Sequence, residues 1–310
     1  MSEFVFAPSH HVPFRDKEAI ERCRRITRDQ IEQHANPDYR IKVIPNAEVP
    51  WIGVTDMLGR IKRSAEEGRR LVMILPNPNP GYRHVARLIN ALQLDCRNVW
   101  GFAMDEYADE DGRIAPDTWK YGFVHSLKSG FWGNIDPALR PPEKQFLGPT
   151  DENIDSYGKM IEDLGGADVI YLGPGWTGHL AFIEPDAPEF DAPLDEWKQM
   201  GTRIVTLSPY TLAQNSLHGS FGMSGDLAAV PPKAATIGPA EVIAARHRIS
   251  RHAITVHGTH TSWQRMITRL VTHGPVTPRL PESLLQTLRS DIYISETAAA
   301  NIEPDFEKGY

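Results

Sequence analysis

The sequence is poor in the features that mark disulfide-bonded, metal-binding and membrane proteins. Its two cysteines, Cys23 and Cys96, form no disulfide framework and match no metal-ligand spacing. No apolar run approaches the ~18 residues of a membrane-spanning helix, and the N-terminus lacks the basic-then-apolar order of a signal peptide. A chain of 310 residues buries enough apolar surface to fold without such supports. We therefore predict a cytoplasmic protein with reduced, buried thiols.

Charge is not concentrated in any one part of the chain. The formal net charge is -7, spread along the sequence, with neither a basic stripe nor a long acidic tail. This pattern argues against nucleic acid as a partner and against a charged interaction arm. Without a membrane-spanning run, we also expect no membrane partner. The 41% hydrophobic and 24% charged residues are ordinary for a globular protein.

Short apolar runs alternate with helical patterns along most of the chain. The near-continuous hydrophobicity of most runs is typical of strands buried on both faces. This alternation predicts an α/β fold with a doubly wound, mostly parallel, Rossmann-like sheet and helices on both of its faces. Ligands of such sheets bind beyond the carboxyl ends of the strands. The expected strands are 41–45, 71–76, 98–105, 167–175, 203–208, 252–258 and 290–296.

Three segments have helical periodicity. The first is 16–35, the second follows Thr150, which could cap it together with Asp151, and the third begins near Thr261. Gly165 and Gly166 should end the second helix. No repeat or linker divides the chain, so we predict an N-terminal extension with one helix over 1–40 and a single α/β domain over 41–310.

Two adjacent acids, Asp105 and Glu106, close one of the apolar runs. Neighbouring strand residues point to opposite sides, so at most one of the two faces a pocket directly. Both are candidate site residues, Glu106 as a contact to substrate. The alternative is a solvated turn in which an acid caps a helix.

A glycine-rich segment, residues 173–179, follows another apolar run, and Glu184 stands five residues after His179. The glycines let the backbone turn tightly and approach a ligand. A carboxylate near an imidazole can fix its tautomer and raise its basicity. The alternative is a tight turn beside a hydrogen-bonded core histidine. The candidate substrate-binding residues here are Gly175, Trp176, Thr177 and Gly178.

A proline-rich loop with Asn77 and Asn79 follows the run at 71–76. Anions bind where a strand leads into a helix, but proline has no N–H to donate, which argues against a cradle of backbone amides. The two asparagines could hydrogen-bond sugar hydroxyls instead. His257 and His260 have the spacing of a metal pair, but no third ligand follows at a recognisable distance, so we predict no metal site.

Taken together, these motifs resemble glucosamine-6-phosphate deaminase, within the wider superfamily that includes 6-phosphogluconolactonase. Residues 102–107 (FAMDEY) look like the family's F-N-M-D-E-Y strand end. Residues 178–185 (GHLAFIEP) look like its G-H-I-A-F-N-E-P segment, and 234–238 like its A-x-T-x-G strand. The resemblance covers roughly residues 40–300. It is specific, because lactonases usually carry D-E-R where this chain has D-E-Y.

The resemblance implies roles for three of the candidates. Asp105 would be the general base that moves a proton between C2 and C1 of an open-chain sugar. His179 would help to open the sugar ring, and Glu184 would orient His179. It also implies a small-molecule sugar substrate, no cofactor and a homo-oligomer.

The chain departs from the family at the phosphate-binding positions. Loop 77–80 replaces a Gly/Ser/Thr-rich turn, Leu217 stands where the family has arginine, and Thr261 where it has lysine. Thr177 replaces an acid of the ring-opening relay. We therefore predict an isomerase or deaminase whose substrate tail is not a conventionally bound 6-phosphate. The neighbouring cations that could bind a relocated phosphate or another anionic tail are Arg83, His84, His257, His260 and Arg265.

Three other functions remain open at this point. An orthodox glucosamine-6-phosphate deaminase would bind the phosphate through other groups. A sugar-binding regulator would keep the fold without turnover, although the presence of a general base argues against it. A lactonase is disfavoured by Tyr107.

Overall fold

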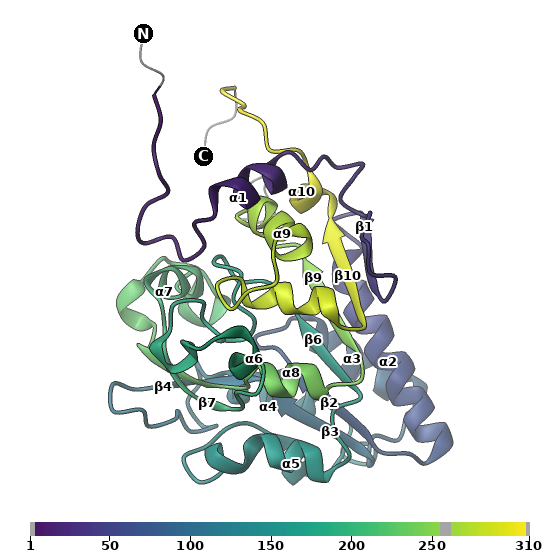
Figure 1. Ribbon diagram of the computed structural model, residues 1–310. Helices are drawn as coiled ribbons and strands as arrows, with labels where there is room; N and C mark the ends of the chain where they lie inside the picture. The colour runs from purple at the N-terminus through teal and green to yellow at the C-terminus, as the bar shows by residue number, and fades with distance from the viewer. Residues whose placement is uncertain (1–3, 255–261, 308–310) are drawn as a thin grey trace.

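A parallel sheet forms the centre of the computed structural model (Figure 1). Within the described residues, 4–254 and 262–307, seven strands pair in parallel in the order β1-β10-β9-β6-β2-β3-β5. The strands are β1 (Tyr39–Ile44), β2 (Leu71–Leu75), β3 (Val99–Ala103), β5 (Phe146–Leu147), β6 (Val169–Leu172), β9 (Arg248–His252) and β10 (Ser290–Ser295). The predicted doubly wound α/β class is confirmed.

Helices cover both faces of this sheet. On one face α2 (Val49–Glu67) and α3 (Gly81–Leu92) pack against β2 and β3. On the other face lie α5 (Tyr157–Asp163), α8 (Pro239–Ala244) and the 3-10 helix η7 (Pro281–Thr287). All five residues of β2 are buried, as a strand covered on both faces requires.

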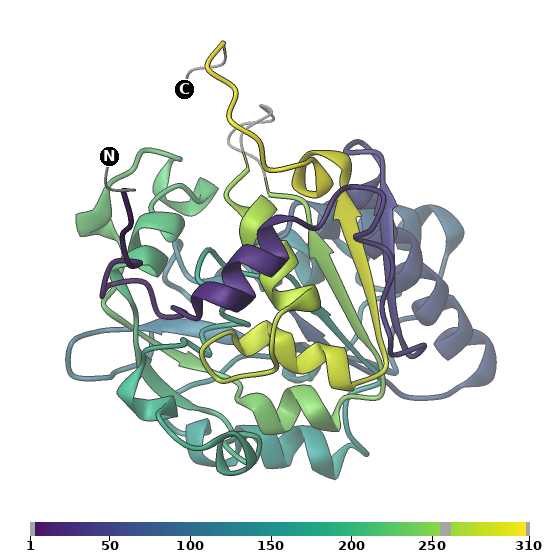
Figure 2. The same ribbon diagram turned by 45° about the horizontal axis from the view of Figure 1, so that its top comes forward.

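The N-terminal helix packs against a helix from the C-terminal part of the chain. Figure 2 shows α1 (Lys17–Arg24) lying across α9 (Gln264–His273), where Cys23 packs with Ile267 and Val271. The remaining α-helices are α4 (Phe123–Gly130), α6 (Leu194–Trp197), α7 (Pro209–Asn215) and α10 (Glu296–Ala299). The shorter 3-10 helices are η1 (Trp132–Asn134), η2 (Glu143–Gln145), η3 (Ile154–Ser156), η4 (Pro188–Phe190), η5 (Gly219–Phe221) and η6 (Leu227–Ala229). No helix in the described part of the chain has the length and apolar character needed to cross a membrane.

A second, antiparallel sheet of three strands lies beside the first within the described residues. It consists of β4 (Asp105–Ala108), β8 (Lys233–Thr236) and β7 (Arg203–Thr206) in that order. The run predicted as one strand over 98–105 is therefore two strands in two sheets. The run at 203–208 pairs antiparallel here and does not join the parallel sheet.

Two further predictions of element boundaries were wrong. The strand expected at 252–258 is β9, which ends at His252; residues 255–258 lie outside the described part of the chain. Its polar residues disguised it, since Arg248 donates to three carbonyls of the α8 end and His252 contacts Thr268 and Glu282. The helix expected over 16–35 ends after Arg24, because the N–H of Ile26 turns back to the carbonyl of Cys23.

The other two helices were predicted more closely. α9 begins at Gln264, near the expected start, and α5 ends before Gly165 and Gly166, both with positive φ. Neither expected cap forms, since Asp151 accepts the N–H of Ile114 instead and the helix opens with η3.

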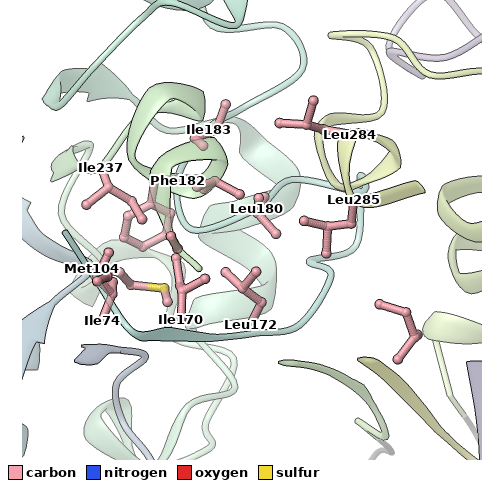
Figure 3. Close-up of a cluster of buried hydrophobic side chains, with 14 of the residues drawn as sticks. Ile74, Met104, Ile170, Leu172, Leu180, Phe182, Ile183, Ile237, Leu284 and Leu285 are labelled. Atoms are coloured by element: carbon pink, nitrogen blue, oxygen red, sulfur yellow. The ribbon is translucent and has the colours of Figure 1, made fainter. Parts of the chain in front are cut away.

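A buried hydrophobic cluster lies under the segment that follows the glycine-rich loop. Figure 3 shows Leu180, Phe182 and Ile183 in one cluster with Ile170 of β6 and with Met104, which joins β3 to β4. This core holds the residues between His179 and Glu184 in place.

Candidate active site

A cavity of about 590 Å³ opens at the carboxyl edge of the parallel sheet. In Figure 1 the arrow of β10 points up toward α10, so this edge is at the top of the sheet. Segments that follow β1, β2, β3, β6 and β9 all contribute to the wall, as the predicted fold requires. Its polar lining includes Asn46, Asn77, Asn79, Asp105, His179, Gln214, Asn215, His218 and Arg251.

Asp105 begins β4 immediately beyond the end of β3, and its carboxyl lines the cavity. The residue is only 5% exposed, and its Oδ1 has no hydrogen-bond partner among the described residues. Burial, together with the nearby carboxylate of Glu106, raises the pKa of Asp105 well above its usual range. The raised pKa makes this carboxyl, in its ionised form, a stronger base than the carboxylate of an exposed aspartate.

Glu106 points away from the cavity, which differs from its predicted role in binding substrate. Its carboxylate accepts the backbone N–H groups of Tyr107 (2.8 Å), Phe123 (3.0 Å) and Val124 (2.7 Å). The last two open α4, so Glu106 caps that helix from outside it. Burial still raises the pKa of Glu106 to about 7, against the lowering effect of these donors.

We expect Glu106→Gln to destabilise the fold without changing substrate affinity. A neutral amide has one acceptor oxygen, so at least one buried N–H of α4 loses its partner, which costs about 1–3 kcal/mol. Denaturant unfolding measures the loss, and Glu110→Gln, at an exposed position on the same hairpin, is the control. A raised KM with unchanged stability would instead support the substrate-binding role.

His179 sits at the end of the glycine-rich loop with its two ring nitrogens in different surroundings. Nδ1 lies 3.1 Å from the hydroxyl of Thr211, 3.2 Å from that of Thr177 and 3.6 Å from a carboxylate oxygen of Glu184. All four side chains are buried. The hydroxyls make the hydrogen bonds, and Glu184 acts on the ring by charge across a longer gap. Thr211, which sequence reasoning missed, thus contacts the same ring nitrogen as Glu184 and lies nearer to it.

Nε2 of His179 faces Gly175, which lines the cavity. A Cβ added to Gly175 would lie 1.8 Å from Nε2, so the ring requires glycine there. The neighbouring Gly178 has φ +83°, a conformation that favours glycine, and it packs against Ile267 away from the cavity. Gly178 was predicted to contact substrate, but in the structure it shapes the backbone of the loop and does not line the cavity.

Trp176 and Thr177 also lie outside the lining of the main cavity. Trp176 stacks on Trp263 at 5.3 Å and borders a separate pocket of about 240 Å³ beside the N-terminal residues Pro13 and Phe14. Its backbone N–H donates to Gln214, which does line the main cavity. Trp176 and Thr177, both predicted to bind substrate, therefore border a different hollow.

Both asparagines of the proline-rich loop line the cavity, and both were predicted to contact substrate. Asn79 accepts the N–H of Gly81 and so holds the loop itself. Asn77 donates to the carbonyl of Leu75, while its Oδ1 is buried with no hydrogen-bond partner in the described chain. The oxygen of Asn77 is thus free of partners among the described residues, whereas that of Asn79 already accepts one hydrogen bond.

The cations expected near the altered loop do not line the cavity where the structure describes them. His84 packs against Trp51, and Arg265 donates to the carbonyl of Thr297. Arg83 is also absent from the lining. His257 and His260 lie outside the described residues.

A different cation, Arg251, lines the cavity from the end of β9. Its Nε is buried, and the described residues provide no hydrogen-bond partner for it. Burial lowers the pKa of Arg251, while Tyr82 and Tyr171 raise it. The guanidinium lies against Gly53 of α2, where an added Cβ would be 3.1 Å from Nη1. The polar residues of β9, a strand that is otherwise buried, were the signal for Arg251 that sequence reasoning did not use.

His218 is a second lining residue that was not predicted. Its Nδ1 is buried without a partner in the part of the chain described. Burial and the nearby His179 lower the pKa of His218 to about 4, so its ring is neutral at pH 7. Leu217, at the position of the family's arginine, lies beside it in the wall.

Fold and cavity together define an α/β enzyme with buried acid–base groups at the carboxyl edge of its sheet. Solved structures with this fold include a monomeric glucosamine-6-phosphate deaminase (TM-score 0.67, 20% identity, 84% of this chain and 98% of that one). A 6-phosphogluconolactonase from Trypanosoma cruzi aligns at TM-score 0.58 and 16% identity over 86% of this chain and 97% of that one.

No family model matches the sequence. Curated relatives do match it. A glucosamine-6-phosphate deaminase of Rhodopirellula baltica is 30% identical over 230 residues, which are 73% of this chain and 80% of the relative. Glucosamine-6-phosphate deaminase 2 of Giardia intestinalis is 28% identical over 230 residues, covering 73% and 77%. The chain belongs to the glucosamine-6-phosphate deaminase family, a family of enzymes, as its motifs predicted.

Proposed function

We propose that this protein is an aldose–ketose isomerase or deaminase acting on an amino sugar or a related sugar. The observation that carries the proposal is the buried carboxyl of Asp105, with an unpaired oxygen, in one cavity with His179. A regulator that only binds sugar has no need of a desolvated acid in its binding cavity, because burial of the charged form is costly.

The proposed reaction begins with ring opening. His179 takes the proton of the anomeric hydroxyl and returns a proton to the ring oxygen as the C1–O5 bond breaks, which leaves a C1 aldehyde. Thr177, Thr211 and Glu184 hold the imidazole for this exchange. Thr177 supports the relay only as a hydrogen-bond partner, because a hydroxyl cannot supply the charge of the acid found in the family.

The proton transfer between carbons follows. Asp105 removes the C2 proton, which the adjacent carbonyl makes acidic, and the C1 oxygen takes up a proton as the electrons move onto it, which gives an enediol or, with an amine at C2, its amino counterpart. Returning the carbon-bound proton to C1 while the C2 hydroxyl loses its own proton gives a ketose, so the proton lost at O2 balances the one gained at O1. If C2 carries an amine, hydrolysis of the resulting C2 imine releases ammonia. General acid–base groups alone supply this chemistry, at about 10²–10⁴-fold each.

For the far end of the sugar we propose an anionic group held by Arg251, since Leu217 leaves the conventional phosphate position without charge. A single desolvated guanidinium beside Asn77 and Asn79 suits one anionic group, such as a carboxylate or a relocated phosphate. Glucosamine 6-phosphate, the substrate in the relatives' names, is on this proposal a poor substrate.

The test is a substrate panel with ammonia and ketose measured separately. It compares phosphorylated, carboxylated and neutral amino sugars, with incorporation of solvent deuterium at the exchanged carbon as a third readout. An anionic sugar other than glucosamine 6-phosphate should react best. A kcat/KM for glucosamine 6-phosphate of about 10⁴ M⁻¹s⁻¹ or more would make the protein an orthodox deaminase. Binding without deuterium exchange for any sugar would favour the regulator.

We expect His179→Gln to impair closed-ring substrates far more than open-chain ones. Glutamine keeps a polar group of similar reach but cannot shuttle a proton, so ring opening should slow by about 10²-fold or more. Rates on a cyclic sugar and on an analogue that cannot close its ring provide the comparison. Equal losses on both would assign His179 to a later step.

A further inference from the structure

A second concave site lies at the opposite edge of the sheet from the candidate active site. Two adjoining pockets of about 340 and 380 Å³ share Arg69, Asp168 and Arg246 in their walls. We call the combined feature the arginine groove. It is lined by Arg60, Arg63, Arg69, Arg70, Arg246 and Arg289, together with Leu71, Val72, Leu164, Asp168 and His247.

The position of the groove follows from the strand order. Leu71 opens β2, Asp168 directly precedes β6, His247 directly precedes β9 and Arg289 directly precedes β10. These are amino ends of parallel strands, at the lower end of β10 in Figure 1. The cavity with Asp105 is at the carboxyl ends, so the two sites are separated by the length of the sheet.

The groove holds more positive than negative charge. Asp168, its one carboxylate lining residue, is paired with Arg246 at 2.7 Å and with Arg69 at 3.7 Å. Arg60 is paired with Asp56 at 2.6 Å. The chain as a whole carries a net charge of -7, so six arginines in one groove do not reflect a general excess of base.

Helix termini explain two of these arginines. Arg70 donates to the carbonyl of Leu164 and Arg246 to that of Gly165, at the end of α5, where cations stabilise the helix dipole. Arg69 pairs in addition with Glu67. This structural explanation leaves other members of the groove unaccounted for.

Arg63 and Arg289 have no such role. Both are exposed, and the structure gives neither side chain a hydrogen bond or an ion pair to any described residue. Arg63 comes one turn after Arg60 on α2, and Arg289 leads into β10. Elements distant in sequence thus bring two unpaired guanidinium groups to the same hollow.

Hydrogen bonds hold another part of the groove wall, at Arg60 and His247, in place. Arg60 donates to Nδ1 of His247 at 2.7 Å, and Nε2 of His247 lies 2.9 Å from Asp291. With Nδ1 as acceptor, Nε2 carries the proton and donates to the carboxylate. Arg60 is therefore held in position, and a ligand would not have to order it on binding.

From this geometry we infer that the arginine groove binds a small phosphate-type anion, either free phosphate or a phosphate ester. Among the residues that the structure describes, the lining contains arginine and no lysine. Guanidinium groups present planar pairs of donors that match two phosphate oxygens at once. The hollow is concave and of small-molecule size, and it is not a stripe of the kind that follows a nucleic-acid backbone. The inference stands independently of the proposed function.

Calorimetric titration with inorganic phosphate and with a simple phosphate monoester such as phenyl phosphate, at constant ionic strength, tests the inference and distinguishes the two ligands. Arg63→Ala/Arg289→Ala should weaken binding by about tenfold or more, as expected for two lost charge-assisted contacts. Lys62→Ala is the matched control, because it removes an exposed charge from the same helix outside the groove, and it should leave affinity unchanged. Arg251→Met removes the cation of the other cavity, and groove binding should survive it.

Two results would overturn the inference. One is the absence of saturable binding in the Arg251→Met protein. The other is equal weakening by Lys62→Ala and the double variant, which would indicate general charge attraction. Arg63→Gln/Arg289→Gln repeats the test with long polar side chains and should match the alanine pair.

Discussion

Asp105→Asn is expected to abolish proton exchange at C2 and at the same time to raise the stability of the protein at pH 7. Asparagine keeps the shape of the side chain but cannot accept a proton, so the exchange rate should fall by at least about 10²–10⁴-fold. Affinity for the sugar should change little. Deuterium incorporation and equilibrium binding measure the two effects separately.

The gain in stability follows from the raised pKa of Asp105, and burial is the largest cause of that rise. An acid whose pKa is higher in the folded state than in the unfolded one binds more protons when folded. Stability therefore falls as pH rises from the unfolded pKa of about 4 toward the folded value. The amide does not ionise, so Asp105→Asn should be more stable than the parent protein above that range.

Urea unfolding of both proteins at several pH values is the measurement. The difference between them should grow from about pH 4 upward. Asp111→Asn is the control, because that carboxylate is 78% exposed and should show no such trend. A destabilised Asp105→Asn protein at pH 7 would mean that the charged carboxylate makes a stabilising contact in the cavity.

The parallel sheet could be predicted because its strands are continuous apolar runs. β2 and β10 match the expected positions closely, and the motifs at strand ends led to Asp105, His179 and Asn77. β9 was misplaced for the opposite reason: Arg248 and His252 are polar but buried, and their partners come from α8, α9 and η7. The partners of Arg248 are backbone carbonyls at the end of α8, and those of His252 lie 16 and 30 residues away, so local hydrophobicity does not reveal them.

The same limit explains the errors at the site. Glu106 looks like Asp105 in sequence, but its partners are the N–H groups of α4, some 17 residues on. Trp176 follows a glycine as a ligand contact would, yet it stacks on Trp263. The boundary of the extension at residue 40 and the homo-oligomer stay predictions, and one solved deaminase of this fold is described as monomeric.

Asp105 and Arg251 both line the cavity, and their chemistry suggests that one serves reactivity and the other specificity. Both are charged groups whose burial opposes their ionised forms. The acid can relieve this by taking up a proton, which is its proposed role. The guanidinium stays charged at neutral pH, so a bound anion is what would compensate it.

We therefore expect Arg251→Met to reduce kcat/KM for an anionic sugar by about 10–100-fold, mostly through KM. The estimate corresponds to the loss of one charge-assisted contact of about 1.5–3 kcal/mol. Methionine keeps an unbranched apolar stem, so the space against Gly53 stays largely filled. Turnover of a neutral analogue should be unchanged, because Arg251 is proposed to touch only the anionic end.

Stability separates this role from a structural one. A buried guanidinium that holds the fold together would leave its partners unpaired when removed, at about 3–5 kcal/mol. With no hydrogen-bond or ion-pair partner among the described residues, Arg251→Met should instead be as stable as the parent or more stable. Arg83→Met, next to the proline-rich loop but outside the cavity lining, is the matched control and should alter neither property. If kcat/KM falls by the same factor for the anionic and the neutral sugar, Arg251 acts on the shape of the cavity and not on the charge of the substrate. That result would contradict the proposal of an anionic group on the substrate.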